Sequence, residues 1–235
     1  MKILVIDVGG THVKVLATGH DEALKIDSGP RLTPKRMVKE VKAATEGWEF
    51  EVVSIGYPGF VFRGRPICEP ANLGGGWVGF DFDEAFGRTV KVINDAAMQA
   101  LGSYRGGSML FLGLGTGLGS AVVIDGELEP MEIAHLPYRK GATFEEYLGL
   151  GGLKRLGKKR WRAHVEAAVA QLAPALQAND IVLGGGNARL LKVLPQGSRL
   201  GDNSNAIVGG YRIWEAAADR HLSGSGDSGT SASQI

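Results

Sequence analysis

The sequence is poor in cysteine. Cys68 is the only one in 235 residues. A single thiol excludes an internal disulfide and any cysteine-based zinc cluster, and it fits a reducing cytosol. No apolar run reaches the roughly 18 residues of a transmembrane helix, and the N-terminus enters a predicted strand without a signal-peptide pattern. We therefore expect a cytoplasmic protein that makes no use of a membrane.

Strong net charge and two common nucleotide-binding motifs are also missing. The formal net charge is +1, so no global field recruits nucleic acid or anionic lipid. The G-x-G-x-x-G fingerprint fails because Leu118 occupies its final glycine position, counted from Gly113. A G-x-x-x-x-G-K-[ST] motif does not occur. These absences exclude a nicotinamide dehydrogenase of the usual kind and a P-loop enzyme.

Glycine, in contrast, is abundant. The chain has 36 glycines, well above the usual share of about 7%. They cluster in short runs between apolar strands, which is typical of turns and ligand loops. The length and the 44% hydrophobic content allow one large domain or two small ones.

The first strand ends in one of these glycine turns. Ile3–Ile6 is a continuous apolar run, which predicts a strand covered on both faces. Asp7 follows, and Gly9 and Gly10 turn the chain into a returning strand. One interpretation is a plain β-hairpin with an acid at the sheet edge. The other is a phosphate cradle in which Asp7 reaches a bound Mg²⁺ through water.

The order of the predicted elements indicates a layered α/β protein. A helix over 34–46 is followed by a strand over 52–56, and a strand over 90–94 feeds a helix that starts at Asp95. Asp95 is interpreted as the N-cap of that helix or as a functional acid at the carboxyl end of a strand, and the two interpretations are compatible. A last helix is predicted over 206–222.

Other polar residues stand in positions that suit a ligand. Asn72 and Trp77 lie in a glycine-rich loop, where an amide and an aromatic wall would suit a sugar. His135 stands near an apolar segment, where a histidine is more often a hydrogen-bonded core residue than a ligand.

A second strand pair over 109–124 resembles the first. Its turn carries Gly115-Thr116, as the first carries Gly10-Thr11. This weak internal repeat predicts two like-folded lobes that hold one phosphate chain between them. Asp125-Gly126 is a separate signal for a type I′ hairpin.

The last third of the chain alternates helix and strand signals. The basic run 154–162 is typical of a solvated helix face. A stripe of apolar residues at helical spacing predicts core packing: Trp161, Val165, Val169, Leu172 and Leu176. Gly184–Gly186 end a strand before a predicted helix over 188–193, and permit either a bound phosphate or base, or close helix packing. We expect a disordered tail over 223–235.

Together these stretches resemble the ROK family of sugar kinases, within the actin/hexokinase/Hsp70 superfamily, most closely its polyphosphate-glucokinase branch. The resemblance extends from Ile3 to about Glu215. It rests on the order and spacing of seven motifs: Ile6–Thr11, Gly56–Gly59, Asn72–Trp77, Asn94–Ala97, Leu114–Ala121, Glu132–His135 and Leu183–Gly186.

The resemblance implies a two-lobed actin-like ATPase (ribonuclease H-like) fold, with mixed sheets flanked by helices and a ligand cleft between the lobes. The N-terminal lobe would comprise 1–94 and the C-terminal helix at about 206–222. The other lobe would comprise 95–205.

The resemblance also implies roles for individual residues. Asp95 is similar to the base that takes the proton from the sugar 6-hydroxyl, and Asp7 to an acid that orients Mg²⁺. The residues implied to bind the sugar are Asn72, Asn94, Glu132, His135 and Glu145. Those implied to bind phosphate or nucleotide are Asp7, Gly9, Gly10, Thr11, Lys14, Gly115, Thr116, Gly117, Gly184, Gly185 and Gly186.

The implied function is that of a Mg²⁺-dependent hexose kinase, a glucokinase, which uses ATP or inorganic polyphosphate and forms a homodimer. The run 154–162 would suit a long anionic donor as well as solvent. The alternatives are a non-catalytic sugar-binding or regulatory protein, and a kinase for another hexose or an N-acetylhexosamine.

The sequence also departs from the family pattern. It lacks the cysteines with which many members bind zinc, so no zinc site is expected. Ala134 replaces the usual glycine before the histidine, which puts the preferred hexose in doubt. The chain begins at the first strand, so the DNA-binding domain of the repressor members is not expected.

Overall fold

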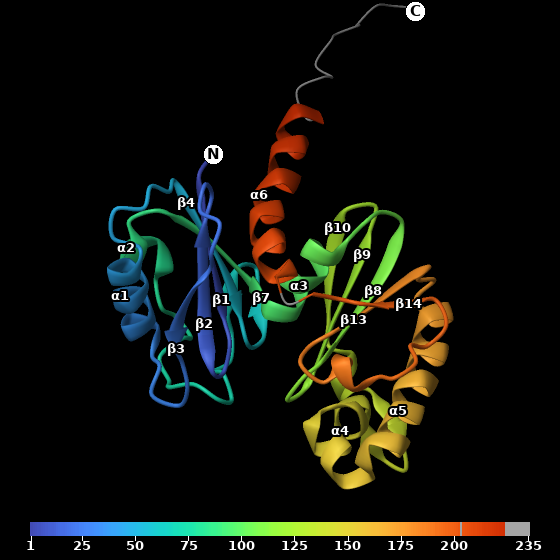
Figure 1. The fold of residues 1–235 in the computed structure, drawn as a ribbon. Coiled ribbons are helices and arrows are strands. Elements are labelled where there is room, and N and C mark those ends of the chain that lie inside the picture. Colours follow the sequence, from blue (N-terminus) through green and yellow to red (C-terminus); the bar gives the residue numbers. More distant parts are fainter. Residues whose placement is uncertain (203, 224–235) are drawn as a thin grey trace, which may run out of the picture.

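The computed structural model describes residues 1–202 and 204–223. The chain folds into two lobes with α3 (Asp95–Ser103) and α6 (Asn205–Ser223) between them (Figure 1). The tail predicted over 223–235 lies outside the described residues except for Ser223, which ends α6. No helix of the described part is long and apolar enough to cross a bilayer.

Each lobe is built on a mixed five-stranded sheet. The first sheet has the order β3-β2-β1-β4-β7, with β1 (Ile3–Val8), β2 (His12–Ala17), β3 (Leu24–Asp27), β4 (Val52–Tyr57) and β7 (Thr89–Asn94). The second has the order β10-β9-β8-β13-β14, with β8 (Ser108–Leu114), β9 (Leu118–Ile124), β10 (Glu127–Met131), β13 (Asp180–Gly184) and β14 (Ser198–Leu200).

The two sheets have the same topology. In each, an antiparallel three-strand meander is extended by two parallel strands beside its first strand. β1 thus corresponds to β8, and the turn after β1 corresponds to the turn after β8. The repeat predicted from Gly10-Thr11 and Gly115-Thr116 is therefore confirmed at the level of the fold, with both turns at the carboxyl ends of central strands.

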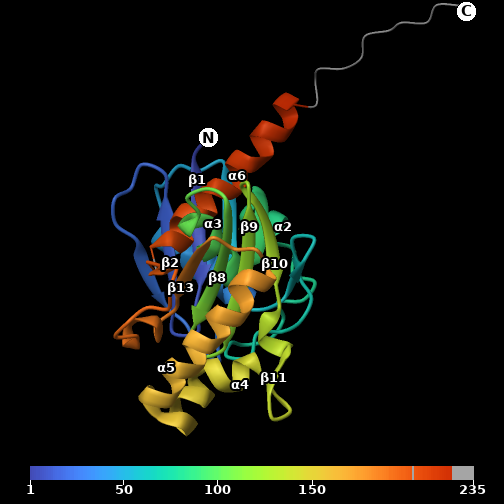
Figure 2. The same ribbon diagram turned by 90° about the vertical axis from the view of Figure 1, so that its right-hand side faces the viewer.

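Helices cover the outer faces of both sheets. α1 (Pro34–Ala44) and α2 (Phe82–Phe86) lie on the first lobe, and α4 (Phe144–Leu148) and α5 (Leu150–Ala175) on the second (Figure 1, Figure 2). α1 begins as predicted, with Thr33 as N-cap and proline at its first position, but ends two residues earlier. Short elements complete the chain: β5 (Val61–Phe62), β6 (Arg65–Pro66), a 3₁₀ turn at Ile133–His135, β11 (Pro137–Arg139), β12 (Ala142–Thr143) and a 3₁₀ turn at Ala188–Leu190.

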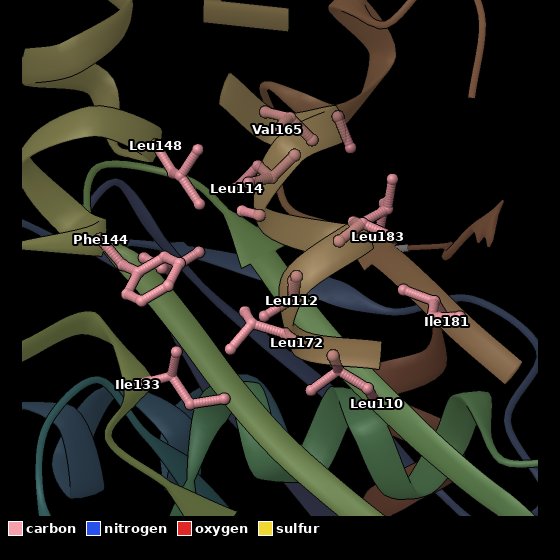
Figure 3. Packing of buried hydrophobic residues seen from close by; sticks show 14 of the residues in the cluster. Leu110, Leu112, Leu114, Ile133, Phe144, Leu148, Val165, Leu172, Ile181 and Leu183 are labelled. Carbon is pink, nitrogen blue, oxygen red and sulfur yellow. The ribbon is translucent and has the colours of Figure 1, made fainter. Parts of the chain in front are cut away.

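The core of the second lobe lies between its sheet and α4 and α5. One face of β8 carries Leu110, Leu112 and Leu114. These leucines pack with Phe144, Leu148, Val165 and Leu172 of the helices (Figure 3). The predicted stripe on α5 is confirmed for Trp161, Val165, Val169 and Leu172, which are buried, while Leu176 is partly buried. The basic run is confirmed as mostly exposed and helical, although it spans a break in α5 at Gly157, whose φ is 74°.

The inner faces of the sheets pack on α3 and α6. Ala97 and Ala100 of α3 meet Met109 and Phe111 of the second sheet, while Met98 packs with Ala206 and Ile207 of α6 and with Ile3 and Val5 of the first. The two helices cross at backbone contact, because a Cβ on Gly102 or Gly209 would collide with main-chain atoms of the other helix. The small alanine and glycine residues therefore let α3 and α6 pack closely against each other and against both sheets.

One local prediction is wrong, and one of the two interpretations of Asp95 is excluded. The helix expected over 188–193 is only the 3₁₀ turn Ala188–Leu190, because Leu191 becomes extended and packs into the core, and Pro195 disfavours helix at the residue before it. Asp95 is not the N-cap of α3. Asn94 is the cap, since it has the extended backbone that a cap needs and its Oδ1 accepts from the N–H groups of Ala96 and Ala97.

The hairpin predicted at Asp125-Gly126 is confirmed. Both residues have positive φ, 49° and 86°, as a type I′ turn requires.

Candidate functional site

A cavity of about 750 Å³ opens between the lobes. Its walls come from the glycine turns of both sheets, the start of α3, the loop around Asn72, and the segment that follows β10. The first sheet and its loops contribute Gly9, Gly10, Gly59 and Asn72, while the second lobe contributes Gly115, Thr116, Glu132 and Glu145. Residues far apart in sequence therefore share one site at the carboxyl ends of the central strands.

The first glycine turn is held by its own hairpin. The Gly9 N–H donates to the His12 carbonyl at 3.0 Å, and Ser28 Oγ donates to the Gly9 carbonyl at 2.6 Å. A Cβ on Gly9 would lie 2.8 Å from that His12 oxygen, so the turn requires glycine there. The turn is therefore both a hairpin and a cavity wall, and the two interpretations of this stretch are compatible.

The second glycine turn is held by distant segments. The Leu118 N–H donates to Glu145 Oε2 at 3.0 Å, and the Leu150 N–H donates to the Thr116 carbonyl at 3.1 Å. Asn187 Nδ2 donates to the Gly115 carbonyl at 2.9 Å. Asn187 was not among the predicted site residues, and its only sequence signal is its place directly after the glycine triplet.

Asp95 lies at the wall of the cavity, in the first turn of α3. Its Oδ1 accepts from the Ala96 N–H at 2.8 Å. Burial, together with the negative charges of Asp7 and Glu132, raises the pKa of Asp95 from 3.8 to about 7, although the Ala96 N–H opposes the shift. Such a carboxylate can accept a proton near neutral pH.

Asp7 lies beside this carboxylate at the end of β1. Its side chain is 13% exposed, and Lys14 Nζ, its cross-strand neighbour, lies 4.0 Å from Asp7 Oδ2. Burial raises the pKa of Asp7, and Lys14 opposes the shift. Two neighbouring carboxylates with a single lysine concentrate negative charge, which a bound cation would offset.

All five residues implied to bind a sugar line the cavity: Asn72, Asn94, Glu132, His135 and Glu145. Glu132 and His135 present exposed side chains, 46% and 74% accessible, with Glu132 Oε2 3.6 Å from His135 Nε2. His135 is therefore not a core histidine. The amide of Asn94 is largely occupied, since it caps α3 and donates to the Gly59 carbonyl at 3.0 Å.

The predicted phosphate residues divide into two groups. Gly9, Gly10, Gly115, Thr116, Gly117 and Gly185 line the cavity. Asp7, Thr11, Lys14, Gly184 and Gly186 do not. Gly184 and Gly185 are also required for packing. A Cβ on Gly184 would collide with Phe111. Gly185 has a φ of +79°, and a Cβ there would collide with the Leu114 backbone.

Trp77 does not form the predicted aromatic wall. It is fully buried in the core of the first lobe, where it meets Tyr57 and Phe82, and its Nε1 donates to the Gly74 carbonyl at 2.7 Å. Its loop is instead fixed by Glu69, whose carboxylate accepts from the N–H groups of Trp77 and Val78 at 3.1 and 3.2 Å. These backbone hydrogen bonds lower the pKa of Glu69.

Glu69, Gln99 and Ser120 are among the cavity-lining residues that were not predicted as site residues. Gln99 lies one turn beyond Asp95 on α3, and Ser120 lies on β9. Their spacing offers the only signal. Gln99 follows Asp95 by four residues, which places both on one side of a helix. Ser120 lies between the buried Leu118 and Val122 on one face of a strand.

Comparison with known proteins agrees with this geometry. The ROK family model matches residues 3–130, more than half of the chain. Polyphosphate glucokinase of Mycobacterium tuberculosis (strain CDC 1551 / Oshkosh) is 27% identical over 207 residues, which cover 78% of this chain and 77% of that protein.

Solved structures extend the comparison to the fold. An inorganic polyphosphate/ATP-glucomannokinase from Arthrobacter sp. strain KM has a TM-score of 0.76 at 24% identity, covering 92% of this chain and 99% of that one. A ROK family glucokinase from Streptomyces griseus, in complex with glucose and AMPPNP, has a TM-score of 0.67 at 19% identity, covering 91% and 99%.

The paired sheets and the cavity between them define the class, a two-lobed α/β protein with the actin-like ATPase fold of the ROK sugar kinases. The sequence match then fixes the family. The chain belongs to the ROK family.

Proposed function

We propose that this protein is a hexose kinase, most specifically a glucokinase, that transfers a phosphoryl group from polyphosphate or ATP to the sugar 6-hydroxyl. The observation that carries the proposal is the position of Asp95, which lines the cavity together with both glycine turns and has a pKa of about 7. A sugar hydroxyl needs an acceptor for its proton, and a positioned carboxylate typically contributes about 10²–10⁴-fold in rate.

The acceptor side of the cavity supports a sugar. Carboxylate and amide groups from three segments, at Asn72, Glu132 and Glu145, line the same cavity as Asp95. Hydrogen-bonding groups of this kind select strongly for sugars that carry the matching hydroxyls. His135 adds an exposed imidazole next to Glu132. In this proposal these residues orient the hexose with its 6-hydroxyl toward Asp95.

The donor side is formed by the two glycine turns. Glycine lets backbone N–H groups approach phosphate oxygens closely, and transfer itself depends on positioning and charge neutralisation more than on covalent chemistry. Lys14 stands behind the first turn and adds positive charge. The proposal therefore assigns the phosphate chain to the space between Gly9-Gly10 and Gly115-Gly117.

The residues present fit Mg²⁺. Asp7 offers a carboxylate with part of its surface exposed, next to the second carboxylate of Asp95. Magnesium sites in phosphoryl-transfer enzymes commonly use one or two carboxylates together with substrate phosphates and water. When bound, the ion would neutralise charge on the phosphates, and Asp7, which lies outside the cavity lining, would hold it through water.

The names of the relatives support a choice of donor and sugar. Proteins named polyphosphate glucokinase and polyphosphate/ATP-glucomannokinase are similar to this chain over most of its length. We therefore propose inorganic polyphosphate or ATP as donor and glucose as first acceptor. We also propose that one lobe comprises 1–94 with 206–222 and the other 95–205. The protein is proposed to be a cytoplasmic homodimer.

A coupled assay tests the proposal. The protein is incubated with Mg²⁺, glucose and either ATP or polyphosphate, and glucose 6-phosphate is measured. We expect turnover with at least one donor and its loss in Asp95→Asn, while Asp125→Asn at an exposed hairpin tip stays active. Absence of turnover with both donors and a panel of hexoses, in folded protein that still binds sugar, would indicate a non-catalytic sugar-binding protein instead.

A further inference from the structure

Ser120 stands out because it places a hydroxyl among apolar side chains. Leu118, Ser120 and Val122 share one face of β9, and all three are buried, with Ser120 4% exposed. The two neighbours belong to the core of the second lobe. A hydroxyl at such a position is unfavourable unless hydrogen bonds satisfy it, so its partners indicate why the chain keeps it there.

Both partners flank Glu132. Ser120 Oγ donates to the Met131 carbonyl at 2.7 Å and accepts from the Ile133 N–H at 3.2 Å. β10 ends at Met131, and Ile133 begins a 3₁₀ turn, so Glu132 itself lies between two regular elements. Its backbone, φ −109° and ψ 49°, belongs to neither a strand nor a helix. One hydroxyl thus supplies the hydrogen bonds that a continuing strand would have supplied on either side of Glu132.

Ser120 also joins the two halves of the cavity. It lies two residues beyond Leu118, whose N–H donates to Glu145 at the end of the second glycine turn. The strand that carries the donor-side turn therefore also fixes the segment that carries Glu132.

We infer that Ser120 is a positioning residue for sugar binding, which clamps the backbone on both sides of Glu132 and so directs its carboxylate into the cavity. The inference rests on the proposed function for what Glu132 binds, while the clamp itself rests on the geometry. Ser120 is not proposed to contact either substrate.

A buried serine in the first sheet serves as the control for Ser120. Ser54 on β4 is fully buried, donates to the Gly210 carbonyl at 2.6 Å and accepts from Trp214 Nε1 at 2.8 Å. It lies outside the cavity wall. Ser54→Ala and Ser120→Ala each remove one buried hydroxyl with one donated and one accepted hydrogen bond, so a purely structural effect would be alike in both.

The first test is a kinetic comparison of the two variants. We expect Ser120→Ala to raise the KM for the hexose about tenfold, because small displacements of a binding group are costly, while the donor KM changes less than about twofold. Ser54→Ala should leave both KM values within about twofold. Equal effects of the two variants on the hexose KM would overturn the inference.

A double-mutant cycle separates action through Glu132 from other effects. In a Glu132→Gln background, Ser120→Ala should add less than about twofold to the hexose KM, because the group it positions is already altered. A full, multiplicative increase would show that Ser120 acts elsewhere. If Ser120→Ala does not fold, Ser120→Cys replaces it in both tests, since a thiol fills the volume but hydrogen-bonds weakly.

Hydrogen exchange tests the clamp without relying on activity. The peptide over 129–136 should exchange about tenfold faster in Ser120→Ala than in wild type, and remain unchanged in Ser54→Ala. Unchanged protection in Ser120→Ala would overturn the inference. A wild-type chain that phosphorylates no sugar would refute the proposed function alone, because the exchange measurement would still decide the clamp.

Discussion

Replacing Asp95 by asparagine should abolish phosphoryl transfer and at the same time stabilise the folded protein at neutral and alkaline pH. The substitution keeps the oxygen that accepts from the Ala96 N–H and removes the charge. The reason for the gain is the raised pKa of Asp95, from 3.8 to about 7, caused by burial and by the charge of Asp7. Between these values the folded state holds a proton that the unfolded state has lost. Stability conferred by the neutral acid is therefore lost as pH rises toward 7.

The shift sets the size of the effect. A difference of about three pKa units corresponds to at most about 4 kcal/mol, at about 1.4 kcal/mol per unit. Asp95 lies at the wall of an open cavity, where water screens the charge, so we expect about half of that, ~2 kcal/mol. The free energy of unfolding of Asp95→Asn, minus that of the wild type, should therefore increase by ~2 kcal/mol in total between about pH 3 and pH 8, and then stay constant at higher pH.

Urea denaturation of the two proteins at several pH values measures this difference. Asp125→Asn is the matched control, because Asp125 is exposed at a hairpin tip with φ 49°, a conformation that asparagine tolerates. An equal change with pH in Asp125→Asn would assign the effect to the loss of any carboxylate and not to the position of Asp95. In the wild type, kcat/KM should rise with pH through about 7, as the base ionises. A stability difference for Asp95→Asn that is flat with pH would refute the raised pKa, and retained turnover would refute its role as base.

Three further predictions follow from single contacts. Gly9→Ala places a methyl group 2.8 Å from the His12 carbonyl, so donor KM should rise at least about tenfold in steady-state assays, with little change in hexose KM. Asn187→Ala removes the hydrogen bond to the Gly115 carbonyl and should lower stability by about 1 kcal/mol in urea titrations and raise donor KM more than hexose KM. Trp77→Ala empties a core site in the first lobe and should cost about 3–5 kcal/mol of unfolding free energy. Unchanged donor KM in the first two, or a loss below about 1 kcal/mol in the third, would contradict the respective argument.

The architecture could be predicted from the sequence because its signals are periodic and repeated. Apolar runs before Gly9 and Gly115 indicated equivalent central strands, and the two sheets share one topology. Failures occurred where long-range packing outweighs local pattern. The segment after Gly186 has helical spacing, but Leu191 contributes more by packing into the core than by continuing a short helix before Pro195.

The site was predicted in part, and the residues that were not predicted were missed for one physical reason. Polar residues next to glycine turns, such as Asn72 and Asp95, can be recognised from their local context. Trp77 has the same context, yet its large apolar surface is buried in the lobe core. Glu69 and Ser120 act through backbone groups of residues 8 to 13 positions away. No local pattern marks such contacts, because the partners are brought together only by the complete sheet and its loops.

Although the two sheets share one topology, their glycine turns are held by different parts of the chain. The first is fixed within its own hairpin and by Ser28, so its geometry needs only the first sheet. The second is held by Glu145, Leu150 and Asn187, which come from α4, α5 and the segment after β13. Glu145 also lines the cavity, where we propose that it binds the sugar, and its Oε2 accepts from the Leu118 N–H at the end of the second turn. Under the proposed function, the sugar site and the donor site therefore share Glu145 of the second lobe.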